Sequence, residues 1–249
     1  NGELLRANGL DGVRIEDGAQ DNIIGGETPD AVNVLSGNAG FGVQIRNANT
    51  SNNWVIGNFI GVGANGVDGM ANAESGVLLA DGASSNQIGG SDAGTGNVIS
   101  GNNADGIQIL GQGTTGNMVL SNVIGLNASE DAPLGNTRNG IRIAQGASGN
   151  HIGNGLSAEG NVIARNGQSG VAVEGPMAQA NAILGNSIYE NAAQGITLIG
   201  GANNGIQPPV IQTLNPISGM AVPNAFVELF VSDSGDGQGK TLVGSANVG

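Results

Sequence analysis

Short clusters of aliphatic and β-branched residues, three to four residues long and bounded by Gly and Asn, recur along residues 8–200. Residues 12–15 (GVRI), 22–25 (NIIG) and 33–36 (NVLS) are examples. The apolar positions lack the i, i+3, i+4 spacing of a helix, and Gly and Asn at the cluster ends favour tight turns. The pattern predicts many short strands separated by turns.

The clusters belong to a long repeat. At an offset of 64 residues three copies of the sequence align without a gap, as Gly12, Gly76 and Gly140 illustrate. Self-similarity at a fixed period indicates a solenoid, in which each unit buries its apolar face against its neighbours. The aligned asparagines form four columns: Asn22, Asn86 and Asn150; Asn33, Asn97 and Asn161; Asn53, Asn117 and Asn181; Asn58, Asn122 and Asn186.

Within each copy the apolar clusters lie about 21 residues apart, as in Val13, Val34 and Val55. We therefore expect three coils in each copy and about nine in the chain, with these valines directly above one another. Stacking at about 4.8 Å would give a rod roughly 40 Å long. The expected fold is all-β, a parallel β-helix over residues 1–205.

The repeated asparagines have a structural interpretation. Asn tolerates left-handed turn conformations, and stacked amides can bond to the amides above and below them. We expect the four columns to form ladders at the corners of the solenoid. A ligand-binding stripe of asparagines is the alternative.

Three segments carry a family resemblance: GNVISGN (96–102), NQIGG (86–90) and DGIQI (105–109). They resemble the right-handed parallel β-helix repeats of the pectate-lyase-like superfamily, especially those of large bacterial exported proteins. The resemblance implies a right-handed helix. It leaves function open, because that superfamily includes lyases, hydrolases, epimerases, adhesins and structural modules.

Residues 206–249 have a different pattern. After Pro208 and Pro209 the apolar runs lengthen and alternate, at 209–214, 225–232 and 241–245. The run PNAFVELFVSDSGDGQGKTLVGSA (223–246) resembles the opening half of an Ig-like β-sandwich. We expect a short sandwich-like segment that packs on the end of the helix, pairs with another chain or is incomplete.

Composition agrees with a thin-walled solenoid. The 249 residues include 47 Gly and only 2% aromatic residues, while 39% are hydrophobic, so small and aliphatic side chains must fill the interior. The absence of Cys does not decide the redox compartment. No apolar run approaches the roughly 18 residues that cross a bilayer, so membrane insertion is not expected.

The formal charge of −13, from 20 acidic and 7 basic residues, repels phosphate backbones. Nucleic acid is therefore not an expected partner. Other protein chains or copies of this chain are, and carbohydrate is also considered.

Candidate catalytic groups are sparse. Glu130, Asp131 and Arg138 share the longest loop of the second copy, and Asp68 and Glu74 lie in its first-copy counterpart. These loops are where a site would be expected, although two acids and one Arg fall short of a sugar-cleaving centre. We identify no catalytic residue with them.

Other polar residues suggest structural roles. Asp17 and Asp81 match at the 64-residue offset, but Gln145 replaces them in the third copy, and three coils would separate them by about 14 Å. His151 is the sole histidine, and for want of partner residues around it we expect neither a Ser-His-Asp triad nor a His-ligated zinc site nor an H-E-x-x-H motif. Because its column varies between the copies, we expect it at a surface or half-exposed position. Arg14 and Arg142 match, with Leu78 between them.

Asp233 and Asp236, in a Gly-rich loop, are a candidate calcium site because carboxylate oxygens suit Ca²⁺. Two carboxylates are few for that ion, and a plain hairpin loop is the favoured interpretation. No cofactor is expected otherwise.

The aromatic residues break the repeat. Trp54, Phe41 and Phe59 all lie in the first copy, where the second copy has Met118, Asp105 and Val123. They could form a sugar-binding patch or cap the end of the solenoid, and the cap is the favoured interpretation.

From these observations we expect a non-catalytic structural or adhesive module of a secreted or cell-surface protein. Its exposed strand edges could associate end to end into filaments. The alternative is a polysaccharide lyase, epimerase or hydrolase of the resembled superfamily. Whether the chain is an enzyme is uncertain.

Overall fold

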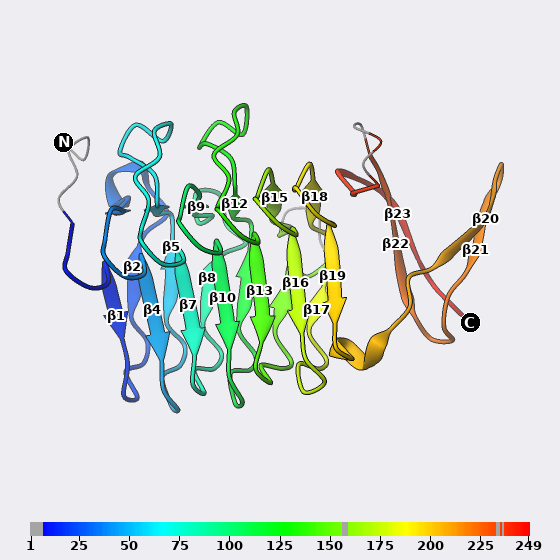
Figure 1. Cartoon of the computed structure of the whole chain (residues 1–249), viewed down its shortest axis with the longest axis horizontal. Coiled ribbons are helices and arrows are strands. Elements are labelled where there is room, and N and C mark those ends of the chain that lie inside the picture. The colour runs from blue at the N-terminus through cyan, green and yellow to red at the C-terminus, as the bar shows by residue number, and fades with distance from the viewer. Residues whose placement is uncertain (1–6, 156–158, 233–234, 236) are drawn as a thin grey trace.

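The computed structural model describes residues 7–155, 159–232, 235 and 237–249. The chain forms a stack of short parallel strands, followed by two antiparallel hairpins at the C-terminal end (Figure 1). The two acidic residues of the predicted calcium site, Asp233 and Asp236, lie outside the described residues.

Three parallel sheets of seven, six and six strands form the walls of the solenoid. Sheet 1 contains β1 (Val13–Ile15), β4 (Val43–Arg46), β7 (Val77–Ala80), β10 (Ile107–Leu110), β13 (Ile141–Ala144), β16 (Val171–Glu174) and β19 (Ile196–Ile199). Sheet 2 contains β2 (Ile23–Gly25), β5 (Trp54–Ile56), β8 (Gln87–Gly89), β11 (Met118–Leu120), β14 (His151–Ile152) and β17 (Ala182–Ile183). Sheet 3 contains β3 (Val34–Leu35), β6 (Phe59–Ile60), β9 (Val98–Ile99), β12 (Val123–Ile124), β15 (Val162–Ala164) and β18 (Ser187–Tyr189).

Within the three parallel sheets each inner strand pairs with the third strand before it and the third strand after it, so one coil contributes one strand to each sheet. This arrangement is a parallel β-helix, and the predicted fold class is confirmed. Small residues that tolerate a wide range of φ, Gly above all, lie at the corners and let the chain change direction between the sheets.

The predicted number of coils is wrong. Val13, Val34 and Val55 lie in β1, β3 and β5, which belong to three different sheets. Val13 instead pairs with Val43, 30 residues later, and Val43 pairs with Val77, 34 residues later. The 64-residue repeat therefore holds two coils, and the described chain has six complete coils and the strand β19 in place of about nine coils. The spacing of about 21 residues separates clusters on different walls of the same or the next coil. It suggested a coil that is too short because all three walls carry the same kind of apolar cluster.

The two coils of one repeat have their long connecting segments at different places. In the first coil the long segment joins β2 to β3 and includes a short 3-10 helix, η1 (Pro29–Ala31), whereas in the second coil only Gly57 and Asn58 separate β5 from β6. The second coil is long after β6, and residues 61–76 and 125–140 form two arches at the top of Figure 1. Loops that recur every second coil have about 10 Å of room along the axis.

The interior is filled by Val, Ile and Leu side chains from all three sheets, such as Ile45, Leu79, Ile88 and Ile99, each fully buried. The buried side chains of successive coils lie above one another because the pairing keeps strands in register, as Ile107 with Ile141 shows. A core of aliphatic columns needs few aromatic residues, which agrees with the composition.

The stacked strands end at Ile199, and a 3-10 segment, η2 (Ala202–Gly205), leads into the tail. The tail forms two separate two-stranded sheets, one of β20 (Val210–Leu214) and β21 (Ile217–Met220), the other of β22 (Phe226–Val231) and β23 (Thr241–Asn247). Figure 1 shows both hairpins beyond the last coil, with β20 and β21 farthest from it.

Candidate functional site

The predicted asparagine ladders are present, but their membership differs from the four columns. The four columns combine into two ladders with a rung on every coil. Ladder I is Asn22, Asn53, Asn86, Asn117, Asn150 and Asn181, joined by amide bonds of 2.8–3.1 Å. Ladder II is Asn33, Asn58, Asn97, Asn122, Asn161 and Asn186, with bonds of 2.8–3.0 Å.

A third ladder follows sheet 3, at the corner with sheet 1. Ladder III is Asn8, Asn38, Asn72, Asn102, Asn136, Asn166 and Asn191, with bonds of 2.8–3.0 Å. Six of its seven members recur at the 64-residue offset, in the two series Asn8, Asn72, Asn136 and Asn38, Asn102, Asn166, and Asn191 falls outside both series. Aligning the sequence at 30 and 34 residues would have found these six, whereas Asn191 follows Asn166 by 25 residues.

The inner rungs are buried and fully bonded. Asn122 is 0% exposed, donates to the carbonyl oxygens of Ile88 and Leu120, and donates to Asn161. Such amides satisfy main-chain carbonyls at corners where no strand partner exists. The ladders therefore stabilise the fold and leave no stripe of free amides for a ligand.

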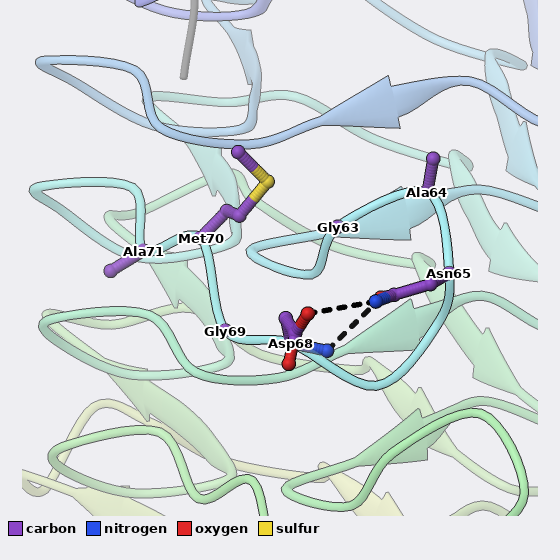
Figure 2. A pocket seen from close by; sticks show the side chains of 7 residues that line it. All are labelled: Gly63, Ala64, Asn65, Asp68, Gly69, Met70 and Ala71. Atoms are coloured by element: carbon purple, nitrogen blue, oxygen red, sulfur yellow. Dashed lines mark hydrogen bonds between the residues drawn. The ribbon is translucent and has the colours of Figure 1, made fainter. Parts of the chain in front are cut away.

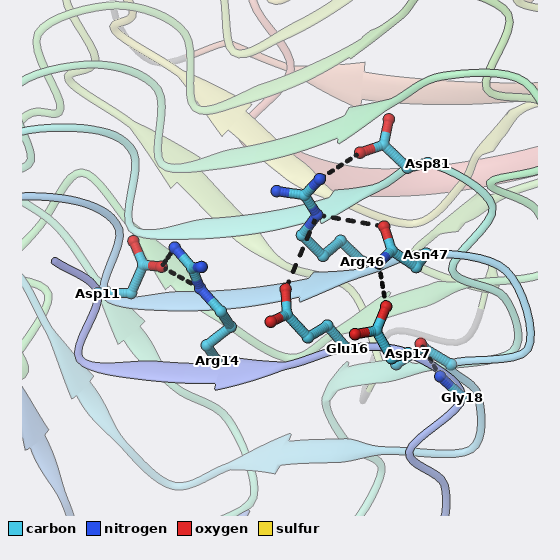
Figure 3. A network of polar contacts seen from close by, with 9 residues as sticks. Asp11, Arg14, Glu16, Asp17, Gly18, Arg46, Asn47 and Asp81 are labelled. Atoms are coloured by element: carbon cyan, nitrogen blue, oxygen red, sulfur yellow. Dashed lines mark hydrogen bonds and ion pairs between the residues drawn. The ribbon is translucent and has the colours of Figure 1, made fainter.

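The outer face of sheet 1 carries isolated ion pairs. Arg46 lies between Glu16 and Asp81, at 4.0 and 3.5 Å, and its neighbour Asn47 donates to Asp17 (Figure 3). Asp17 and Asp81 are thus two coils apart, about 10 Å, and not the predicted three coils. Asp81 contacts the Arg46 guanidinium, whereas Asp17 accepts from the Asn47 amide, so the two carboxylates have different partners.

Two further Arg residues on this face are each paired with one acid. Arg14 donates to Asp11 at 2.8 Å, and the hydrogen bond and charge of Asp11 raise the pKa of Arg14. Arg142 bonds to Glu174 at 2.7 Å, and this hydrogen bond raises the pKa of Arg142. In both pairs the carboxylate is engaged by a guanidinium, so its contacts are those of a structural ion pair.

A polar column that the sequence analysis missed runs just before sheet 1, through Ser75, Asp105, Asn139 and Ser169. Asp105 is 0% exposed and accepts from the main chain and side chain of Asn139, and from Gln108. Asn139 in turn accepts from the main chain of Ser169. A buried Asp with these donors has a structural role in joining the coils.

The outer face of sheet 2 presents exposed apolar side chains from several coils. Ile23, Trp54 and Met118 are 63%, 45% and 37% exposed, and Gln87 pairs between Trp54 and Met118. His151 follows on the next coil and is exposed, as predicted. Trp54 lies on the second coil and faces sideways, so the interpretation of Trp54 as an end cap is wrong.

The other two aromatic residues lie on other walls. Phe59 is on the outer face of sheet 3, where Gly66 of the first arch lies against its ring. Phe41 precedes β4, and its main-chain N–H donates to Asp11. The structure therefore does not bring the three aromatic residues into one patch.

The arches hold the acidic residues that the sequence singled out. Ala128 of the second arch donates to Gly66 of the first, so the arches stack. Asp131 accepts from Asn127 at 2.7 Å, and Glu130 is exposed. Within the described residues Arg138 forms no ion pair with either acid.

The first arch surrounds a hollow of about 460 Å³ between Gly63 and Ala71 (Figure 2). Its polar groups are already paired: the Asn65 amide donates to Asp68 at 2.8 Å, and its oxygen accepts from the main chain of Val67 and Asp68. Glu74, in the same arch, is exposed. The hollow has no Arg, Lys or His on its wall.

The described part of the chain has no group of three or more His, Cys, Asp or Glu residues able to hold a metal ion. The same residues form no helix long and apolar enough to span a bilayer. The chain matches no protein-family model, no curated protein and no solved structure.

Proposed function

We propose that this chain is a non-catalytic β-helix module that acts as a rigid spacer or adhesive surface in a secreted or cell-surface protein. The observation that carries the proposal is the use of its repeated polar residues. The asparagines of the inner rungs, such as Asn97 and Asn122, are buried and bonded from coil to coil, so the repeat is occupied in holding the rod together.

The distribution of charge supports the same proposal. On the sheet 1 face, Arg14 and Arg142 each pair with one acid, and Arg46 pairs with both Glu16 and Asp81. In the arches, Asp68 and Asp131 contact amides. A glycosidase needs two carboxylates facing one bond, and a lyase needs a charged cluster at the scissile bond. An excess of acidic residues over basic ones also keeps a long surface solvated and disfavours nucleic acid as a partner.

The proposal includes three narrower statements: the chain belongs to the pectate-lyase-like superfamily, the protein is exported, and residues 206–249 are Ig-like. Their support is the resemblance of the repeats and of the 223–246 run to such modules. Paired hairpins such as β20–β21 and β22–β23 are compatible with a sandwich segment.

Incubation with uronate polymers and neutral glycans, with and without Ca²⁺, tests the non-catalytic role. We expect neither new reducing ends nor unsaturated products, whose ultraviolet absorbance reports lyase activity. Turnover of any polymer that Glu130→Gln and Asp131→Asn abolish would overturn the proposal in favour of the enzyme alternative.

Trp54 favours one form of the adhesive role, contact with carbohydrate. An exposed indole on a flat sheet, with the amide of Gln87 beside it, offers a stacking surface and a hydrogen-bonding group. Since Trp54 is the sole tryptophan, its fluorescence reports binding at this face alone. Saturable quenching by a glycan, lost in Gln87→Ala and kept in the distant Arg138→Ala, would support it, and quenching by no glycan would exclude it.

A further inference from the structure

The ladders have a direction. In each one, the side-chain amide of an Asn donates to the side-chain oxygen of the Asn on the following coil, as Asn97 does to Asn122 and Asn122 to Asn161. The main-chain N–H of the same residue donates to the same oxygen. The C-terminal end of the stack therefore presents donors, and the N-terminal end presents acceptors.

The segment after the last coil supplies acceptors to that donor end at all three corners. Asn203 of η2 accepts from the main chain of Asn181, the last rung of ladder I, at 3.0 Å. Glu228 of β22 accepts from the main chain of Gly185, next to the last rung of ladder II, at 2.9 Å. Gln238 accepts from the main chain and side chain of Asn191, the last rung of ladder III, both at 3.1 Å.

Gln238 takes the place that an Asn of a seventh coil would occupy. It is 6% exposed, and its amide also donates to the carbonyl oxygens of Asn191 and Ala193 at 2.8 and 3.0 Å. One side chain thus makes four hydrogen bonds to the end of ladder III. A solvent-facing loop residue would not be expected to be so buried or so fully bonded.

The residues after Gln238 cover the edge of β18. Ser187 donates its main-chain N–H back to Asn161 of the preceding coil, whereas the N–H of Ile188 donates to Gly239 at 2.7 Å. The Ser187 hydroxyl donates to the Lys240 carbonyl at 2.6 Å, and the Lys240 ammonium lies 5.0 Å from the centre of the Tyr189 ring. The strand edge that a further coil would use is therefore occupied.

The opposite end has the complementary chemistry. β1, β2 and β3 are the outermost strands of their sheets, and Asn22 and Asn33, the first rungs of ladders I and II, are exposed. The apolar side chains of this coil, Val13, Ile24 and Leu35, are only partly buried.

We propose that residues 202–232 and 237–240 form a cap in cis that occupies the donor end of the solenoid and prevents it from stacking on the first coil of a second copy of this chain. The proposal rests on the proposed structural role and extends it to how association is limited. A tethered cap competes at an effective concentration on the order of millimolar, so it excludes a second copy at micromolar concentration without needing strong bonds.

The test breaks the cap in the full-length chain. Glu228→Ala with Gln238→Ala removes two of the three acceptors, and Thr213→Ala with Ser218→Ala is the matched control, because it breaks a tail hydrogen bond at the exposed β20–β21 hairpin. Light scattering after size exclusion measures mass as concentration rises. We expect at least about a doubling of mass for the cap variant at concentrations where wild type and control stay monomeric, since an uncovered strand edge pairs with another.

Mixing identifies the surface used. In wild-type chains β1, β2 and β3 have no further strand partner within the described residues, whereas the donor end is covered, so added wild type should terminate growing stacks and lower the mean mass of the cap variant. Association that excess wild type does not reduce would overturn the proposal, because it would not involve the first coil. Wild-type chains that already polymerise would overturn it too.

Circular dichroism and thermal unfolding check that the variants fold. If the double variant unfolds, Gln238→Asn, which shortens the side chain by one methylene, is the milder variant. Folded but monomeric variants, or unfolding of both variants, would overturn the cap, the latter because the tail would be part of the folding unit. Neither result affects the spacer role, which only the polymer-turnover assay contradicts.

Discussion

Asparagine is the residue that organises this chain. A corner between two parallel sheets leaves main-chain carbonyls without strand partners, and an amide that donates to them and to the next amide satisfies both. Asn53 and Asn58 show why the spacing matters: five residues apart in sequence, they belong to two different ladders.

Replacement of an inner rung should be costly. Asn122→Ala removes donors to Ile88, Leu120 and Asn161 and leaves those buried oxygens with fewer partners. We expect a loss of about 3 kcal/mol or more in the free energy of unfolding, measured by urea denaturation. Asn33→Ala, at an exposed first rung, is the control and should cost about 1 kcal/mol or less. Equal losses at both positions would contradict the role of burial.

Tyr189 reports on the end of the solenoid. Burial raises its pKa, and the nearby Lys240 ammonium opposes that rise. The folded chain therefore keeps the phenolic proton at pH values where the unfolded chain has lost it, so stability should fall as pH rises above about 10. Tyr189→Phe should remove this part of the alkaline loss of stability.

Lys240→Ala should raise the pKa of Tyr189 further, because a cation that favours the phenolate is gone. Since Tyr189 is the sole tyrosine, ultraviolet difference absorbance follows its titration without interference from other phenols. A fall in its pKa would mean that Lys240 contributes more by covering the ring than by its charge.

At the scale of the element, the strands are so short that their ends decide where the coil turns. Gly25, Gly89 and Gly153 end or directly follow strands of sheet 2 at positive φ, and a Cβ on any of them would lie about 2 Å from a carbonyl oxygen of the next coil. They recur every 64 residues because only alternate coils carry the long segment between sheets 2 and 3.

Gly89→Ala should therefore be among the most damaging single substitutions. Its φ is 80°, and a Cβ would lie 1.9 Å from the Leu120 oxygen, so two coils would have to separate. We expect a loss of about 3 kcal/mol or more, measured by chemical denaturation. Gly9→Ala, where a Cβ meets nothing within 4 Å, should leave stability within about 0.5 kcal/mol of wild type.

For the whole molecule, the number of coils sets the length. Six coils at about 4.8 Å give a solenoid of roughly 30 Å, against about 40 Å for nine coils. Small-angle scattering should show a stiff body whose longest distance includes this rod and the tail hairpins, unchanged by moderate salt because core packing and buried amides hold it together. A distance distribution that broadens with salt would indicate a flexible chain instead.

The sequence by itself determined the architecture. The 64-residue period, the short apolar clusters and the Asn and Gly columns require stacked coils with amide ladders, because repeated local chemistry can be satisfied only by its own copies. Those signals are local, and they are the same whichever strands pair with one another. The exposed position of His151 could also be predicted, since its column varies from copy to copy.

The pairing itself was decided by tertiary structure. Val13 could lie above Val34 or above Val43 as far as apolar pattern is concerned, and only the closure of three walls selects Val43. The sideways position of Trp54 follows from that closure. The burial of Gln238 depends on a contact 47 residues away, with Asn191, which no repeat encodes. Long-range contacts between unlike segments leave no periodic trace in the sequence, and for that physical reason the end of the solenoid could be seen only in the folded chain.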